Sequence, residues 1–187
     1  MGLDTRAYRK ATDEWQKDWV TLSNERGWRP VMFGLMMEPV GERNYGLTGG
    51  YVGGRAPFTL DDAPTWHQDG LDELPWPGGL IGGMISANGN APSFRGKAYT
   101  HYVEAITGES LYAACDEPWE GEQLRSITEL LEAAAEPTAE DAVREQIADA
   151  FDVPPRMLGD TTLEERQALA RWFRVCVDHD LAVSGDC

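Results

Sequence analysis

The sequence predicts an α+β fold, in which a loop-rich N-terminal layer with short strands precedes a helical C-terminal half. Two observations predict it. Glycine and proline crowd residues 46–92 and interrupt any long helix there. From about residue 93 onward, apolar side chains recur every three or four residues, which is typical of amphipathic helices. We expect an α+β core domain over residues 1–135 and a helical hairpin over residues 138–187, the hairpin being either separate or part of the same domain.

The first segment has two interpretations. Apolar residues from Tyr8 to Leu22 recur with helical spacing, which predicts one helix over residues 4–26. Alternatively, residues 2–8 form a short strand and the helix begins near Thr12. Both interpretations place an amphipathic helix before the loop-rich layer.

The loop-rich layer contains two candidate strands. The apolar run over residues 29–37, bounded by Pro30 and Pro39, has the length of a buried strand. Residues 79–86 are the second candidate. Between them, the glycine-rich stretch 46–55 predicts turns or bulges, because glycine tolerates positive φ angles.

The first two helices expected in the C-terminal half are bounded by capping and breaking residues. Ser93 is an N-cap candidate for a helix over residues 94–107, and Gly108 ends it. The next helix covers about residues 119–135 and stops before Pro137. The side chains expected to face the core are Tyr99, Tyr102, Val103, Ile106, Leu124, Ile127, Leu130 and Leu131.

The last two expected helices begin at threonines. Thr138 and Asp141 have the spacing of a capping box, in which each side chain bonds the backbone amide of the other residue. Thr161 and Glu164 have the same spacing. The positions expected to face the core are Val143, Ile147 and Phe151 in the third helix, and Leu169, Trp172, Phe173, Cys176 and Leu181 in the fourth.

Acidic residues dominate the chain after residue 60. The net charge is −16, and residues 61–187 contain 25 acidic and eight basic residues. The densest part, residues 109–152, holds 13 acidic residues with only Arg125 and Arg144. Such a field repels nucleic acid and attracts basic protein surfaces. We therefore expect no direct nucleic-acid binding and a basic partner, with solubility or tolerance of high salt as the alternative reason for the acidity.

Carboxylates follow one face of the third C-terminal helix, at Asp141, Glu145, Asp149 and Asp152. One negative charge per about 5–6 Å of helix axis approaches the spacing of phosphates along a nucleic-acid strand. The stripe is therefore either a solvated surface or a mimic of a phosphate backbone. The residues expected to contact a basic partner are Glu129, Glu132, Asp141, Glu145 and Asp149.

Candidate ligand-binding residues are few. Arg95, Lys97 and His101 lie close together in the sequence and are candidates for holding an anionic small molecule. Gly96-Lys97 does not complete a phosphate loop, because Ala98 replaces the Ser or Thr that binds magnesium. The histidines lack the three or four converging ligands that a metal site needs. We predict no catalytic residues, no metal and no cofactor.

The expected compartment is the cytoplasm. No run approaches the roughly 18 apolar residues that span a bilayer, and the N-terminus becomes polar too early for a secretory signal. Three cysteines without a close pair are typical of free thiols in a reducing compartment. No membrane attachment is expected.

Parts of the sequence resemble two groups of known proteins. The opening MGLD, the segment SFRGK at residues 93–97 and the block ITGESLY at residues 106–112 resemble small bacterial and phage proteins that have no assigned activity. The resemblance covers about the first two thirds of the chain and implies a recurring structural or binding unit. Residues 147–159 more weakly resemble an element of phage portal proteins. Both resemblances imply a mobile-element context.

Together these observations predict a phage-type accessory or anti-defence protein that is not an enzyme and binds a host protein. Its acidic helices would occupy the basic surface of a nucleic-acid-binding factor, such as a defence nuclease or a CRISPR effector, and inhibit it. One alternative is a small enzyme or ligand-binding protein that uses the glycine-rich layer and residues 93–101. Another is a component of virion assembly.

Overall fold

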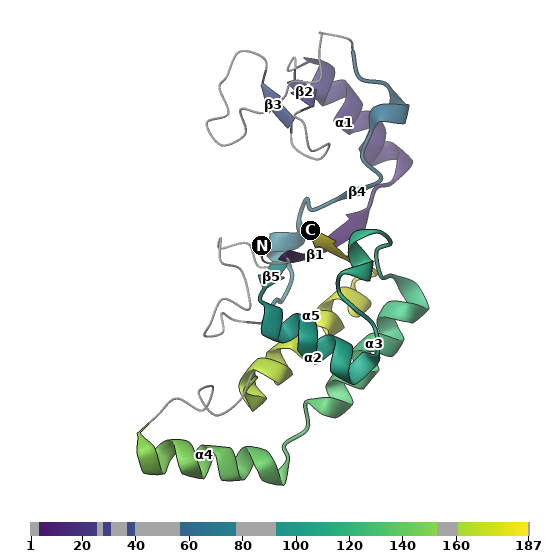
Figure 1. Cartoon of the computed structure of the whole chain (residues 1–187). Coiled ribbons are helices and arrows are strands. Elements are labelled where there is room, and N and C mark those ends of the chain that lie inside the picture. Colours follow the sequence, from purple (N-terminus) through teal and green to yellow (C-terminus); the bar gives the residue numbers. More distant parts are fainter. Residues whose placement is uncertain are drawn as a thin grey trace. The chain divides into compact units, whose positions relative to one another are not determined.

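The computed structural model describes residues 4–25, 28–30, 37–39, 57–77, 93–152 and 161–186 (Figure 1). The predicted α+β class is confirmed. The chain divides into two compact units, residues 1–9 with 68–187, and residues 10–67. The domain boundary predicted at residues 135–138 lies inside the first unit and stays a prediction.

The first unit contains an antiparallel sheet whose strands come from distant parts of the sequence. β1 (Asp4–Lys10) pairs with β5 (Ser93–Arg95) and with β6 (Ala182–Asp186). β1 has alternating burial, with Thr5 and Ala7 buried, as expected for a strand with one covered face. Of the two interpretations of the first segment, the strand followed by a helix is therefore confirmed.

The helix expected to begin after Ser93 was placed too early. Phe94 belongs to β5 and is buried, with its ring centroid 4.9 Å from that of Trp172. Pairing with β1 overrides the local helical pattern because it places this aromatic ring in the core. α2 (Lys97–Thr107) begins after Gly96 and ends at Gly108, as predicted.

The helical core of the first unit is formed by α2, α3 (Gly121–Ala134) and α5 (Leu163–Asp178). α3 packs against both α2 and α5, and Figure 1 shows the three helices side by side. Leu169, Trp172, Phe173 and Cys176 are buried in α5 as predicted, and complete burial raises the pKa of the Cys176 thiol. Leu181 is also buried, but it lies after the helix has ended. In α3, Leu130 was wrongly placed, because its side chain is 45% exposed.

Trp119 joins the helices to the sheet. Its backbone N–H donates to the Val183 carbonyl at 2.8 Å, and its carbonyl accepts from the Val183 N–H at 2.9 Å. The indole is buried. This unit also contains two single-turn helices, η2 (Leu71–Glu73) and η3 (Ala113–Cys115).

The second unit is built around α1 (Asp13–Glu25), η1 (Leu60–Asp62) and β4 (Trp66–His67). Trp15 stacks on His67 with centroids 4.0 Å apart. Trp19 meets Phe58 edge-on at 5.2 Å. Aromatic contacts thus join α1 to the segment that follows residue 57.

The apolar run at residues 29–37 is not a single strand. Its two ends lie in β2 (Trp28–Pro30) and β3 (Met37–Pro39), which pair with each other in antiparallel fashion. The glycine-rich stretch 46–55 and the candidate strand 79–86 lie outside the described residues.

Two findings bear on the expected compartment. Among the described residues, no helix combines the length and apolar character that a membrane crossing requires. Cys115 is disulfide-bonded, so the expectation of free thiols was wrong at this residue, whereas Cys176 is free. The cytoplasm stays a prediction that the cysteines no longer support.

Candidate functional site

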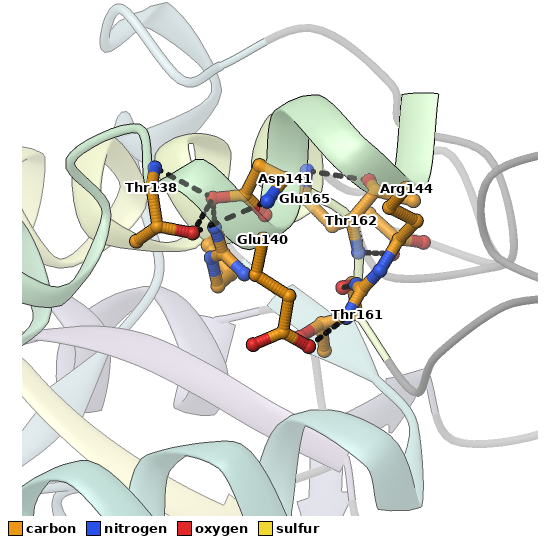
Figure 2. Close-up of polar contacts among 8 residues, drawn as sticks. Thr138, Glu140, Asp141, Arg144, Thr161, Thr162 and Glu165 are labelled. Carbon is orange, nitrogen blue, oxygen red and sulfur yellow. Dashed lines mark hydrogen bonds and ion pairs between the residues drawn. The ribbon is translucent and has the colours of Figure 1, made fainter. Parts of the chain in front are cut away.

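The start of α4 (Ala139–Phe151) is fixed by the capping box predicted there (Figure 2). Thr138 Oγ1 accepts a hydrogen bond from the Asp141 amide at 3.2 Å. Asp141 Oδ2 accepts from the Thr138 amide at 2.9 Å and from its hydroxyl at 2.7 Å. The box holds the Asp141 carboxylate on the buried side of the helix.

Arg166 of α5 pairs with this carboxylate. Its Nη2 donates to Asp141 Oδ2 at 2.6 Å, and the two side chains are only 12% and 7% exposed. Burial raises the pKa of Asp141, but hydrogen bonds from Arg166 and Thr138 outweigh it and hold the pKa at about 2. Asp141 is therefore charged at neutral pH, but its charge is neutralised by Arg166 of the same chain.

Arg144 makes a second link between α4 and the start of α5. Its Nη1 donates to the Thr161 carbonyl at 2.8 Å, and its Nη2 donates to Glu140 Oε1 at 3.3 Å (Figure 2). The arginine side chain is mostly buried, whereas Glu140 is exposed. We call the residues that join the two helices the α4–α5 clasp: Thr138, Asp141, Arg144, Thr161 and Arg166.

The capping box of α5 lies one residue after the predicted pair Thr161 and Glu164. Thr162 Oγ1 accepts from the Glu165 amide at 3.1 Å, and Glu165 Oε2 accepts from the Thr162 amide at 2.8 Å. The Tyr99 hydroxyl donates to the other carboxylate oxygen of Glu165 at 3.0 Å. Glu165 is buried, and both of its carboxylate oxygens accept hydrogen bonds, one of which joins α2 to α5.

The interior beside the clasp contains polar atoms, and some of them lack hydrogen-bond partners among the described residues. The Tyr102 hydroxyl and the Arg166 Nε atom are buried and lack hydrogen-bond partners within the described part of the chain. Burial raises the pKa of Tyr102; the charge of Arg166 lowers it and that of Asp141 raises it. α4 is therefore attached over polar atoms rather than over a closely packed apolar surface.

Glu132 of α3 is also neutralised within the chain. Arg174 of α5 donates to both of its carboxylate oxygens, from Nε at 2.8 Å and from Nη2. This bidentate hydrogen bonding lowers the pKa of Glu132 against the effect of burial. The same hydrogen bonds are the largest cause of the raised pKa of Arg174. The pair stabilises the contact between α3 and α5.

Other carboxylates remain exposed. Glu145, Asp149 and Asp152 follow α4 on its solvent side, and none of them forms an ion pair among the described residues. Glu129 is exposed on α3. Of the five residues predicted to meet a basic partner, three are thus exposed and two bind arginines of this chain. We call Glu145, Asp149 and Asp152 the α4 acidic face.

An apolar face of α4 is exposed as well. Val143, Ile147 and Phe151 were expected to face the core, but they are 52%, 41% and 73% exposed. The expectation was wrong because the packed side of α4 carries Asp141 and Ala148, which are the buried residues of this helix. With about 100° of rotation per residue, the three apolar side chains lie roughly opposite the α4 acidic face. We call Val143, Ile147 and Phe151 the α4 apolar face.

The anion site predicted at Arg95, Lys97 and His101 stays a prediction, because the structure describes the side chain of only one of the three residues. Arg95 lies in β5 and Lys97 is the first residue of α2, but their side chains lie outside what the structure describes. His101 is exposed on α2. Within the described ranges, no group of three or more His, Cys, Asp or Glu residues is placed to bind a metal.

No family model, curated protein or solved structure matches this chain. The resemblance of residues 93–97 and 106–112 to bacterial and phage proteins therefore stays a prediction. In the structure, the first segment spans β5 and the start of α2, and the second spans the end of α2 and the turn after it.

Proposed function

We propose that this chain is a non-enzymatic protein that binds a partner protein through charge, with the α4 acidic face as part of the contact. The observation that carries the proposal is the row of exposed carboxylates at Glu145, Asp149 and Asp152, in a chain of net charge −16. Complementary charge accelerates association and makes it sensitive to salt. The partner surface is accordingly basic.

A nucleic-acid-binding protein is the partner class that this face suits best. The three carboxylates are spaced by about 6 Å and about 4.5 Å along the helix axis, near the spacing of phosphates. Asp141 does not contribute, because it is bound to Arg166. The sequence resemblances favour a phage-type accessory protein that occupies, and so inhibits, the basic surface of a host defence factor.

The test compares two charge reversals of equal size. The E145K/D149K variant alters the α4 acidic face and leaves the clasp intact. The E104K/E109K variant changes the net charge equally, on α2 and the turn after it. Nucleic-acid-binding proteins captured from a lysate by the wild-type chain are purified, and displacement of labelled duplex DNA from them is measured at low and high salt.

We expect the wild type and E104K/E109K to displace DNA with similar apparent affinity. The apparent affinity of E145K/D149K should be at least about tenfold lower, a difference of about 1.4 kcal/mol in binding free energy. Displacement by the wild type should weaken as salt is raised. Equal behaviour of the two double variants would contradict the proposal, because the attraction would then reflect total charge rather than this face.

A further inference from the structure

The α4 apolar face has no role in charge-based binding. Val143, Ile147 and Phe151 form a ridge along the helix, and Ala139 and Ala150 extend it. On an ideal helix these five residues cover a strip about 120° wide. A strip of that width ordinarily faces a protein core. Because this strip is exposed, we looked for a molecule that could cover it.

The contacts between α4 and the rest of the first unit leave this strip exposed. Asp141 and Arg144 reach α5 and Thr161 through polar contacts (Figure 2). Ala148 is the buried apolar residue of α4, and it contributes little area. The clasp thus orients the helix with its larger apolar side chains pointing away from the packed side.

We infer that the α4 apolar face docks into a hydrophobic groove of a partner protein, and that the rims of this groove are basic. The inference rests on the proposed function in one respect, the positive charge of the partner. Helices that bind in grooves use anchors at i, i+4 and i+7. Val143, Ile147 and Ala150 have this spacing, and Phe151 adds an aromatic anchor at the end of the helix.

Charge complementarity specifies the rims of the groove. A helix is about 10–12 Å across with its side chains, and the Debye length is about 8 Å at physiological ionic strength. Rims that flank α4 therefore lie within about one Debye length of Glu145 and Asp149. Glu140 lies within the angular range of the strip itself, at its N-terminal end. Basic rims are attracted to these carboxylates and acidic rims are repelled.

A second copy of this chain fits the strip less well than a cationic partner. Each copy carries a net charge of −16, and residues 109–152, which include α4, hold 13 acidic residues and two arginines. Packing two copies through α4 would bring these segments together and cost repulsive energy. The same field attracts a cationic protein.

The test uses designed two-helix hairpins as substitutes for the partner groove. One hairpin presents a leucine groove with lysine rims, the second a serine groove with lysine rims, and the third a leucine groove with glutamate rims. Binding to the full chain is measured by isothermal titration calorimetry at physiological salt. The variants are I147D and F151S on the strip, and L60D as a matched control at an exposed leucine of η1.

Only the leucine–lysine hairpin is expected to bind saturably, with L60D binding like the wild type and both strip variants at least tenfold weaker. Circular dichroism checks that each variant is folded. Unchanged binding of I147D and F151S, or equal binding of the serine–lysine hairpin, would overturn the inference. Sedimentation that shows a dimer lost in I147D would also overturn it, because a second copy would then occupy the strip.

Failure of this inference is distinguishable from failure of the proposed function. If the serine–lysine hairpin binds equally well and E145K/D149K weakens it, the charge-based proposal stands and groove docking falls. If E145K/D149K binds the leucine–lysine hairpin like the wild type while I147D does not, groove docking stands and the acidic face is not a contact.

Discussion

Asp141 is the residue on which the attachment of α4 depends. Asp141→Asn keeps an oxygen for the Thr138 cap but removes the charge that Arg166 needs. An arginine that is only 12% exposed would lose its counter-ion. We expect a loss of about 3 kcal/mol, at the lower end for a broken buried ion pair. Hydrogen exchange should locate the loss in α4, and denaturant unfolding should give its size.

Glu140→Gln is the matched control for that substitution. Glu140 pairs with Arg144 on the same helix, but its side chain is 82% exposed. Exposed pairs of this kind contribute less than about 0.5 kcal/mol. Similar losses in the two variants would mean that the Asp141–Arg166 pair does not anchor α4.

The clasp should also respond to acid. The pKa of Asp141 is about 2, below its ordinary value of 3.8, so the unfolded chain binds the proton more readily than the folded chain. Its stabilisation is therefore fully present above about pH 4 and is lost as the pH falls toward 2. Denaturant midpoints across this range should fall more steeply for the wild type than for D141N. Parallel profiles would show that another carboxylate controls the acid response.

At the scale of single elements, α2 depends on a glycine at each end. Gly96 has φ 146°, and an added Cβ would lie 2.9 Å from the ring of buried Tyr99. Gly108 has φ 75°, but an added Cβ there would meet nothing within 4 Å. Gly108→Ala should cost about 1 kcal/mol from backbone strain, and Gly96→Ala should cost more, about 2–3 kcal/mol. Thermal unfolding of the two variants checks this order, and a reversal would contradict the tight packing at Gly96.

The helices were predicted from the sequence more accurately than the strands. Periodicity and caps located both ends of α3 and α4 to within two residues, and the C-terminal end of α2, because these signals are local. Phe94 has the same local pattern, yet it lies in a strand, because its partner Thr5 in β1 is far away in sequence. β6 was missed for the same reason, since pairing with β1 defines it.

The candidate site was predicted only in part. Helical spacing correctly grouped Glu145 and Asp149, but it could not show that Asp141 is paired with Arg166, 25 residues further on. Amphipathic spacing also assumes that the apolar side of a helix is the packed side. The α4 apolar face breaks this assumption, because ion pairing determines which side of α4 is buried.

At the scale of the whole molecule, repulsion among carboxylates opposes folding. With a net charge of −16, the compact state brings like charges together. Raising ionic strength from 0.01 M to 0.1 M shortens the Debye length from about 30 Å to about 10 Å. We expect the Tm to rise over this range, by about 2–4 °C for each kcal/mol gained. Calorimetry at each salt concentration measures the shift.

The E145K/D149K variant provides the comparison for this experiment. It removes two of the exposed negative charges and adds two positive ones, so its Tm should rise less with salt than that of the wild type. A Tm that falls with salt in the wild type would mean that attractive pairs, such as Glu132 with Arg174, outweigh the repulsion.

The pairing of β1 with β5 and β6 has a kinetic consequence. β1 finds one partner near the middle of the sequence and the other near residue 186, so the sheet closes long loops before any of its hydrogen bonds form. Such non-local contacts slow folding, whereas helices form rapidly from neighbouring residues. The helices of the first unit should therefore form before β1 pairs with β5 and β6. We expect the pairing of β1 to be the rate-limiting step in the folding of this unit.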